Sequence, residues 1–149
     1  EERAHAVELL KQTITSGSAL HKFAEFVKAQ GGDPEDVMIP GRLPVASEKI
    51  EAKAAADGFV TDILAEQIGV ACMTLGGGRE TKESAIDLSV GICLKKKIGA
   101  PVSRGDAIAE IYANDKKRGA DAKKLVEDAY RYGETVPEKR QMIRKIITE

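Results

Sequence analysis

The chain has 149 residues, of which 42% are hydrophobic and 32% are charged, an ordinary composition for a globular domain. Its 23 basic and 24 acidic residues leave a net charge of −1, which argues against a dedicated nucleic-acid-binding protein. No apolar run approaches the ~18 residues that a membrane-spanning helix needs. The two cysteines, Cys72 and Cys93, are predicted to be small core side chains. Because no disulfide framework is readable, we expect a reducing, cytoplasmic setting.

The N-terminal part of the chain is predicted to form a helical hairpin. Apolar residues at helical spacing indicate a helix over residues 1–15, and the pattern is present from the first residue, which suggests a piece of a longer protein. Ser18 is expected to cap a second helix that runs through Gln30. This helix should end at Gly31-Gly32, because glycine readily adopts the left-handed conformation. His21 is expected to be partly buried on its face.

The hydrophobic period changes after a proline-rich stretch. Residues 33–47 hold three of the five prolines and are predicted to be a linker. Alternation over residues 50–54 indicates a strand, and a turn at Asp57-Gly58 separates it from a second strand over residues 59–64. A helix is predicted next, over residues 66–75.

The strongest strand signal lies over residues 86–95, where apolar side chains alternate with charged or small ones. Residues 98–111 are predicted to form a tight β-hairpin with its apolar residues turned inward. A helix is predicted over residues 119–132, with Gly133 as its stop. The apolar residues of the tail after Pro137 fit either a closing strand or a short helix, and we expect the strand.

A glycine-rich loop after residue 75 is the most suggestive candidate site. Its candidate residues are Gly76, Gly77, Gly78, Arg79 and Lys82. Glycines let a backbone approach a ligand closely, and an arginine can pair with an anion. The spacing matches neither the dinucleotide fingerprint nor the phosphate-binding P-loop. The alternative is that the glycines only end a helix, and that Arg79 pairs with Glu83 on a helical surface segment.

The remaining reactive side chains suggest no catalytic set. His5 and His21 lie 16 positions apart, outside any metal-ligand spacing, so no metal site is expected. The run Lys95-Lys96-Lys97 is predicted to be a solvated turn. From its residues alone, the chain is an α/β domain with a glycine-rich loop and no complete active site.

Four segments in order resemble the C-terminal part of the pyrimidine-nucleoside phosphorylase family, which includes thymidine phosphorylase. They are FAEFVKAQGGD at residues 23–33, AADGFV at 55–60, LGGGRETKESAID at 75–87 and VGICLKKKIGAPVSRGDAIAEIYA at 90–113. Together they cover most of the chain.

The resemblance implies an α+β fold: an α/β-hammerhead domain, similar to the barrel-sandwich of biotinyl and lipoyl carriers, preceded by a helical hairpin. Residues 1–32 would be the last helices of a preceding α/β domain, residues 33–47 the connection, and residues 48–149 the C-terminal domain.

The resemblance also implies a pentosyltransferase of pyrimidine salvage. Phosphate, the co-substrate, attacks a pyrimidine nucleoside and releases the free base and a pentose 1-phosphate. The family's phosphate-holding, pyrimidine-holding and monovalent-cation sites lie upstream, so no catalytic residue and no cofactor is assigned here. The parent protein is expected to be a cytoplasmic homodimer without nucleic-acid or membrane partners, and Gly76–Lys82 is expected to help enclose substrate. Thymidine and uridine both remain candidate substrates.

Two alternatives come from other classes of protein. A structural or interaction domain would brace an active site that the rest of the polypeptide carries. A biotinyl or lipoyl carrier would need a modifiable lysine at a hairpin tip in a Met-Lys-Met or Asp-Lys-Ala setting, and the sequence has neither.

Overall fold

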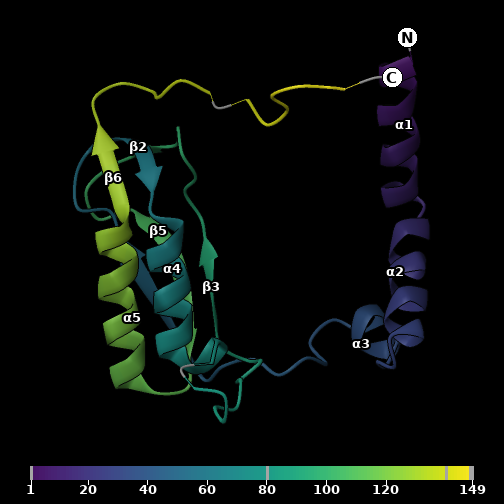
Figure 1. The fold of residues 1–149 in the computed structure, drawn as a ribbon, viewed down its shortest axis with the longest axis horizontal. Helices are drawn as coiled ribbons and strands as arrows, with labels where there is room; N and C mark the ends of the chain where they lie inside the picture. The colour runs from purple at the N-terminus through teal and green to yellow at the C-terminus, as the bar shows by residue number, and fades with distance from the viewer. Residues whose placement is uncertain (1, 80, 140, 148–149) are drawn as a thin grey trace. The chain divides into compact units, whose positions relative to one another are not determined.

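The structure is a computed structural model that describes residues 2–79, 81–139 and 141–147. The chain divides into two compact units, Glu1–Pro44 and Val45–Glu149, which are described separately (Figure 1). Among the described residues, none of the helices has both the length and the apolar character needed to cross a membrane.

The first unit contains the expected pair of helices, α1 (Glu2–Thr15) and α2 (Ser18–Ala29). The residue that caps α2 is Gly17, not Ser18. Gly17 has a φ of 75°, and its carbonyl accepts the His21 amide at 3.1 Å. His21 is exposed, so the expectation of partial burial was wrong: its ring turns back to the Gly17 carbonyl, with Nδ1 at 2.9 Å. The predicted stop is confirmed, because Gly31 has a φ of 85° just beyond α2.

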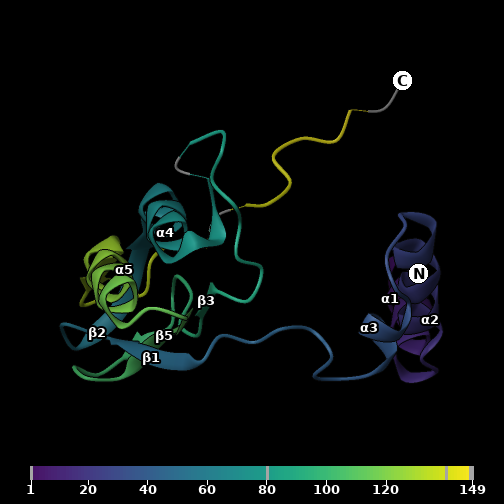
Figure 2. The same cartoon turned by 90° about the horizontal axis from the view of Figure 1, so that it is seen from below.

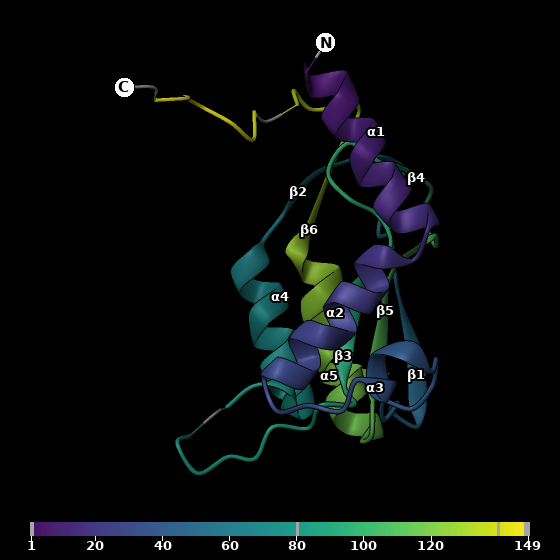
Figure 3. The same ribbon diagram turned by 90° about the vertical axis from the view of Figure 1, so that its right-hand side faces the viewer.

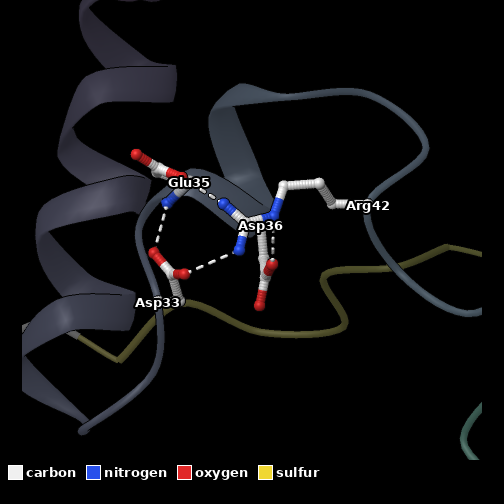
Figure 4. A network of polar contacts seen from close by, with 4 residues as sticks. All are labelled: Asp33, Glu35, Asp36 and Arg42. Carbon is white, nitrogen blue, oxygen red and sulfur yellow. Dashed lines mark hydrogen bonds and ion pairs between the residues drawn. The ribbon is translucent and has the colours of Figure 1, made fainter.

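The stretch predicted to be a linker contains a short helix, α3 (Glu35–Met38), which the sequence analysis did not foresee. One guanidinium gathers three carboxylates around this helix (Figure 4). Arg42 lies 2.9 Å from Asp33 and 3.2 Å from Asp36, and it also pairs with Glu35. These ion pairs fold the proline-rich stretch back onto itself. The assignment of the hairpin to a preceding domain stays a prediction.

In its described residues, the second unit contains two three-stranded antiparallel sheets and the helices α4 and α5. The first sheet has the order β1-β5-β3 and the second the order β4-β2-β6. The strands are β1 (Glu48–Lys53), β2 (Gly58–Ile63), β3 (Gly91–Leu94), β4 (Pro101–Val102), β5 (Ala107–Ala113) and β6 (Tyr130–Gly133). The helices are α4 (Ala65–Cys72), which continues into the wide turn η1 (Met73–Gly77), and α5 (Lys116–Ala129). This confirms the α+β class, and the described strands form no closed barrel.

The core lies between the helices and the first sheet. Figure 2 shows α4 and α5 side by side over the layer of β1, β5 and β3. The largest fully buried side chains come from both layers and from the second sheet: Val60, Ile108, Ile111 and Val126. Most of the residues that α4 and α5 bury are small: Ala71, Gly119, Ala122 and Ala129. A Cβ at Gly119 of α5 would lie 3.1 Å from the Ala113 Cβ, so the helix packs directly onto the sheet.

The predicted hairpin over residues 98–111 is wrong. β4 pairs with β2, whereas β5 pairs with β1 and β3, so the two strands belong to different sheets. The turn between them is closed locally, with the Asp106 amide donating to the Ser103 carbonyl at 2.9 Å. The β2 residue Val60 exchanges backbone hydrogen bonds with Ala100 at 3.0 Å and Gly99 at 2.8 Å, which draws β4 away from β5.

The last predicted helix is also too long, because α5 ends at Ala129 and the next four residues form β6. Tyr130 determines this switch. Its hydroxyl donates to the carbonyls of Lys96 at 2.9 Å and Ile108 at 3.2 Å, and burial raises the pKa of Tyr130 to about 12. Gly133 therefore lies in a strand against β2 and is not a helix stop.

The expectations for Cys72, Cys93 and the tail after Pro137 fail for a common reason: these residues are apolar, but the fold does not bury them. Cys93 is exposed and Cys72 half-buried, and both thiols are free. The described residues after Pro137 form no strand, and their apolar side chains are exposed: Met142, Ile143, Ile146 and Ile147.

Candidate functional site

The glycine loop begins where α4 ends. The helix widens into η1 and is terminated at Gly76, whose φ of 97° is in the left-handed region that favours glycine. Gly77 is needed for a different reason. A Cβ at this position would lie 2.9 Å from the Cys72 Sγ and 3.2 Å from the Cys72 carbonyl oxygen. Gly76 and Gly77 therefore end the helix in a turn that disfavours other side chains at these two positions.

The far end of the loop is fixed to this turn through Asp87. The Asp87 amide donates to the Gly76 carbonyl at 2.9 Å. Its carboxylate accepts the hydroxyl of Ser89 at 2.6 Å, the amide of Ser89 at 2.9 Å and the side-chain amide of Asn114 at 2.7 Å. These hydrogen bonds, those from Ser89 foremost, hold the pKa of Asp87 below its ordinary value. The base of the loop is thus closed by hydrogen bonds of the Asp87 backbone and side chain.

The turn at Asp87 shows that the predicted strand over residues 86–95 is too long. Within residues 86–95 the structure has a strand only at Gly91–Leu94. An aspartate that bonds the backbone two residues ahead offers the chain a turn in place of a strand ladder. As a result Leu88, which alternation would place on an apolar face, is 85% exposed.

The cationic candidates of the loop point to solvent. Arg79 and Lys82 are both exposed, and Figure 3 shows the loop extending beyond the end of α4. The alternative of a helical Arg79–Glu83 pair finds no support, because residues 81–83 form a bend and turn. No ion pair joins the two side chains in the described part of the loop.

Arg118 lies beside the loop and was not predicted. It lines a cavity of about 130 Å³ together with residues of η1 and the loop: Met73, Gly76, Gly78, Ser84 and Ala85. The predicted helix began at residue 119, whereas α5 begins at Lys116 after the cap Asp115, which accepts the Arg118 amide at 2.8 Å. The sequence did contain a signal for Arg118. The first turn of α5 has three basic residues, Lys116, Lys117 and Arg118, and positive charge at a helix N-terminus is unfavourable to the helix dipole, which marks this turn as a candidate for a role other than helix stability.

A second charged cluster lies on the first sheet. The carboxylate of Glu110 on β5 contacts Lys49 of β1 at 2.7 Å, Lys95 at 3.0 Å and the Tyr112 hydroxyl at 3.0 Å. Hydrogen bonds from Lys49 and then Lys95 lower the pKa of Glu110 to about 2. Lys96 pairs with Asp106 at 3.6 Å. The lysine run is therefore partly engaged in structure and is not simply a solvated turn.

We expect this cluster to make stability depend on pH. The folded-state pKa of Glu110 is depressed, so its stabilising contribution is present above the unfolded pKa of about 4.3 and is lost as the pH falls toward 2. Glu110→Gln should lower Tm at pH 7, and the difference from the parent chain should shrink steadily below pH 4. Thermal melts between pH 2 and pH 7 measure this, with the exposed Glu134→Gln as control. An undiminished difference at pH 2 would contradict the ionic origin.

The described residues hold no complete catalytic set. Residues 2–79, 81–139 and 141–147 contain no cluster of His, Cys, Asp and Glu side chains that could bind a metal ion. His5 and His21 are both exposed on the helices of the first unit. The groups that the structure brings together at the glycine loop are backbone amides, Asp87, Asn114 and Arg118. The Asp87 carboxylate is engaged by Ser89 and Asn114, so in this arrangement it serves to orient the loop.

Residues 59–133 match the model of a known domain family, the pyrimidine nucleoside phosphorylase C-terminal domain. The chain belongs to this family. The matched residues run from β2 through β6, so they include the glycine loop, Asn114 and Arg118.

Curated relatives extend the similarity over nearly the whole chain. A pyrimidine-nucleoside phosphorylase of Staphylococcus haemolyticus is 46% identical over 145 residues, which are 97% of this chain and 33% of the relative. One from Geobacillus stearothermophilus is 44% identical over 128 residues, 86% of this chain and 29% of the relative. One from Staphylococcus aureus is 49% identical over 117 residues, 78% of this chain and 27% of the relative. The chain thus spans about a third of the length of these relatives.

Proposed function

We propose that the chain is the C-terminal domain of a pyrimidine-nucleoside phosphorylase and that it serves phosphorolysis without supplying the reacting groups. The family match and the relatives' names carry this proposal. In the reaction, a phosphate oxygen forms a bond to the anomeric carbon of the nucleoside as the bond to the pyrimidine breaks. The products are a pentose 1-phosphate and the free base. The protein as a whole would be a pentosyltransferase of pyrimidine salvage.

Such a reaction has two requirements that the described residues do not meet by themselves. Charge develops on the departing base and on the sugar, so positioned donors must stabilise it, and phosphate must be held in line with the bond that breaks. The described residues offer a capped loop and an arginine beside it, and the histidines lie on exposed helix faces. This supports a bracing role for the chain, with the reacting groups in the part of the polypeptide that corresponds to the rest of the relatives.

We further propose that the tip of the glycine loop helps to enclose substrate. The packing of Gly77 against Cys72 and the bond from Asp87 to Gly76 hold the base of the loop, while Arg79 and Lys82 extend into solvent. Two cations at the tip of an anchored loop suit a reaction that uses phosphate and forms a sugar phosphate. Loops of this kind exclude water and complete a site without performing the main chemistry.

Several properties of the whole protein belong to the same proposal. We place it in the cytoplasm as a homodimer and assign any monovalent-cation site to the part of the polypeptide outside this chain. Nothing favours a carrier role: Lys95 and Lys96 are engaged by Glu110 and Asp106, and the hairpin that a carrier needs is absent from the described residues.

The assay that tests the function compares two proteins with thymidine, uridine and phosphate. A polypeptide that joins this chain to the remaining two thirds of a relative's length should turn over at about 1 per second or faster, the ordinary range for enzymes. The chain alone should release no base above background. Turnover by the chain alone would show that it carries reacting groups, and an inactive longer polypeptide would overturn the assignment.

Arg79→Ala tests the role of the loop. In the longer polypeptide we expect kcat/KM to fall about tenfold, which corresponds to about 1.4 kcal/mol of lost transition-state stabilisation, with Tm unchanged because Arg79 is exposed. Arg104→Ala is the matched control, since Arg104 is also exposed but lies in the turn before β5. If both variants stay within twofold of the parent, the loop is a surface feature.

A further inference from the structure

Asn114 joins three segments that are far apart in the sequence. It follows the last residue of β5, and its side-chain oxygen accepts the amide of Ser47 at 2.9 Å. Its side-chain nitrogen donates to the Asp87 carboxylate at 2.7 Å and to the Ser89 hydroxyl at 2.8 Å. A single side chain therefore holds the start of β1 and the far end of the glycine loop.

The hydrogen bonds allow only one orientation of this amide. An asparagine has two N–H donors and one carbonyl acceptor, and here both donors and the acceptor are used. Turning the amide over would set its nitrogen against the donating Ser47 amide and its oxygen against the Asp87 carboxylate. An aspartate at position 114 would likewise set two carboxylates against each other. The position thus requires a side chain that accepts on one side and donates on the other.

The two segments that Asn114 joins have different relations to the rest of the chain. Ser47 lies three residues after Pro44, where the first compact unit ends. Asp87 closes the base of the glycine loop by donating to Gly76 at 2.9 Å. Asn114 thus joins the backbone near the unit boundary directly to the loop, in addition to the sheet, in which β1 and β3 both pair with β5.

We propose that Asn114 is a positioning residue that couples the entrance of the second unit to the glycine loop. The proposal rests on the proposed function to the extent that the loop serves turnover. Asn114 does not itself act on substrate: it keeps the loop base and the start of β1 in one arrangement. Any change in the unit boundary during the reaction is then accompanied by a change in the loop.

Amide hydrogen exchange in the 149-residue chain tests the coupling, since local opening is read segment by segment. Asn114→Ala removes all three bonds and should speed exchange at least tenfold in residues 45–50 and in residues 81–90. Asn114→Asp keeps an acceptor for Ser47 but loses both donors, so it should speed exchange only in residues 81–90. Asp57→Ala is the matched control, because it removes another long-range bond, from the Arg104 amide at 2.8 Å, and should change neither segment.

Two exchange outcomes would overturn the proposal. In one, Asn114→Ala releases a single segment; in the other, it speeds exchange equally throughout Val45–Glu149, as a purely structural residue would. A kinetic readout in the longer polypeptide then separates positioning from stability. We expect kcat to fall about fivefold in both Asn114 variants with KM within twofold, and an unchanged kcat would refute the positioning role. If the parent polypeptide shows no phosphorolysis, the proposed function fails while the exchange pattern still decides on Asn114.

Discussion

Gly58→Ala is expected to lower the free energy of unfolding of the second unit by about 3 kcal/mol or more. Gly58 opens β2 with a φ of 127°, a conformation that L side chains rarely adopt. A Cβ there would also lie 2.5 Å from the carbonyl oxygen of Gly133 in β6. Backbone cannot move aside as a flexible side chain can, so the pairing of β2 with β6 must open to admit the methyl group. Urea unfolding followed by circular dichroism measures the loss.

Gly105→Ala separates the two causes of this loss. Gly105 has a φ of 94° in the turn before β5, yet a Cβ there would meet no heavy atom within 4 Å. Gly105→Ala should therefore lower the free energy of unfolding only by the backbone strain, about 1–2 kcal/mol. Equal losses for the two variants would show that the close approach between β2 and β6 is not present in solution.

Gly58 also illustrates what the sequence can and cannot predict. The Asp57-Gly58 pair indicates a turn because both residue types favour turn conformations, and the structure places a bend there. The reason that only glycine fits is Gly133, 75 positions later, and no local pattern contains that contact. The helices α1, α2 and α4 and the strands β1 and β2 were likewise predictable from local patterns. In β1 and α4 the periodicity agrees with burial, whereas α1 buries none of its residues and α2 buries only Ala24.

Predictions failed where a distant partner decided the outcome. β4 has only two residues, too few for a sequence pattern to indicate which strand it pairs with. It forms its backbone hydrogen bonds with β2 and not with β5. Tyr130 ends α5 because its hydroxyl finds carbonyls 22 and 34 residues away. At the candidate site, the glycine triplet was recognisable from the sequence, whereas Asn114 was not: its partners lie 25 to 67 residues away, and a lone asparagine after a strand has no distinguishing pattern.

Ile111→Ala should destabilise the second unit by about 2–5 kcal/mol, the range for truncating a large buried aliphatic side chain. Ile111 is completely buried in the central strand of the first sheet, where it pairs with Ile50 on one side and Ile92 on the other. Removing its outer carbons leaves a cavity between the sheet and α5, because the neighbouring strands are held in register by their backbone bonds. Thermal and urea unfolding of the variant measure the loss.

Leu88→Ala is the counterpart that tests the corrected strand. The alternating pattern gives Leu88 the same apolar face as Ile92, and a core residue there would cost several kcal/mol on truncation. In the structure the Asp87 turn exposes 85% of Leu88, so the variant should stay within about 0.5 kcal/mol of the parent chain. A loss above about 2 kcal/mol would mean that residues 86–90 extend β3 in solution and that Asp87 does not cap the loop. Because Asn114 acts through Asp87, the same measurement bears on whether the coupling between the loop and β1 exists.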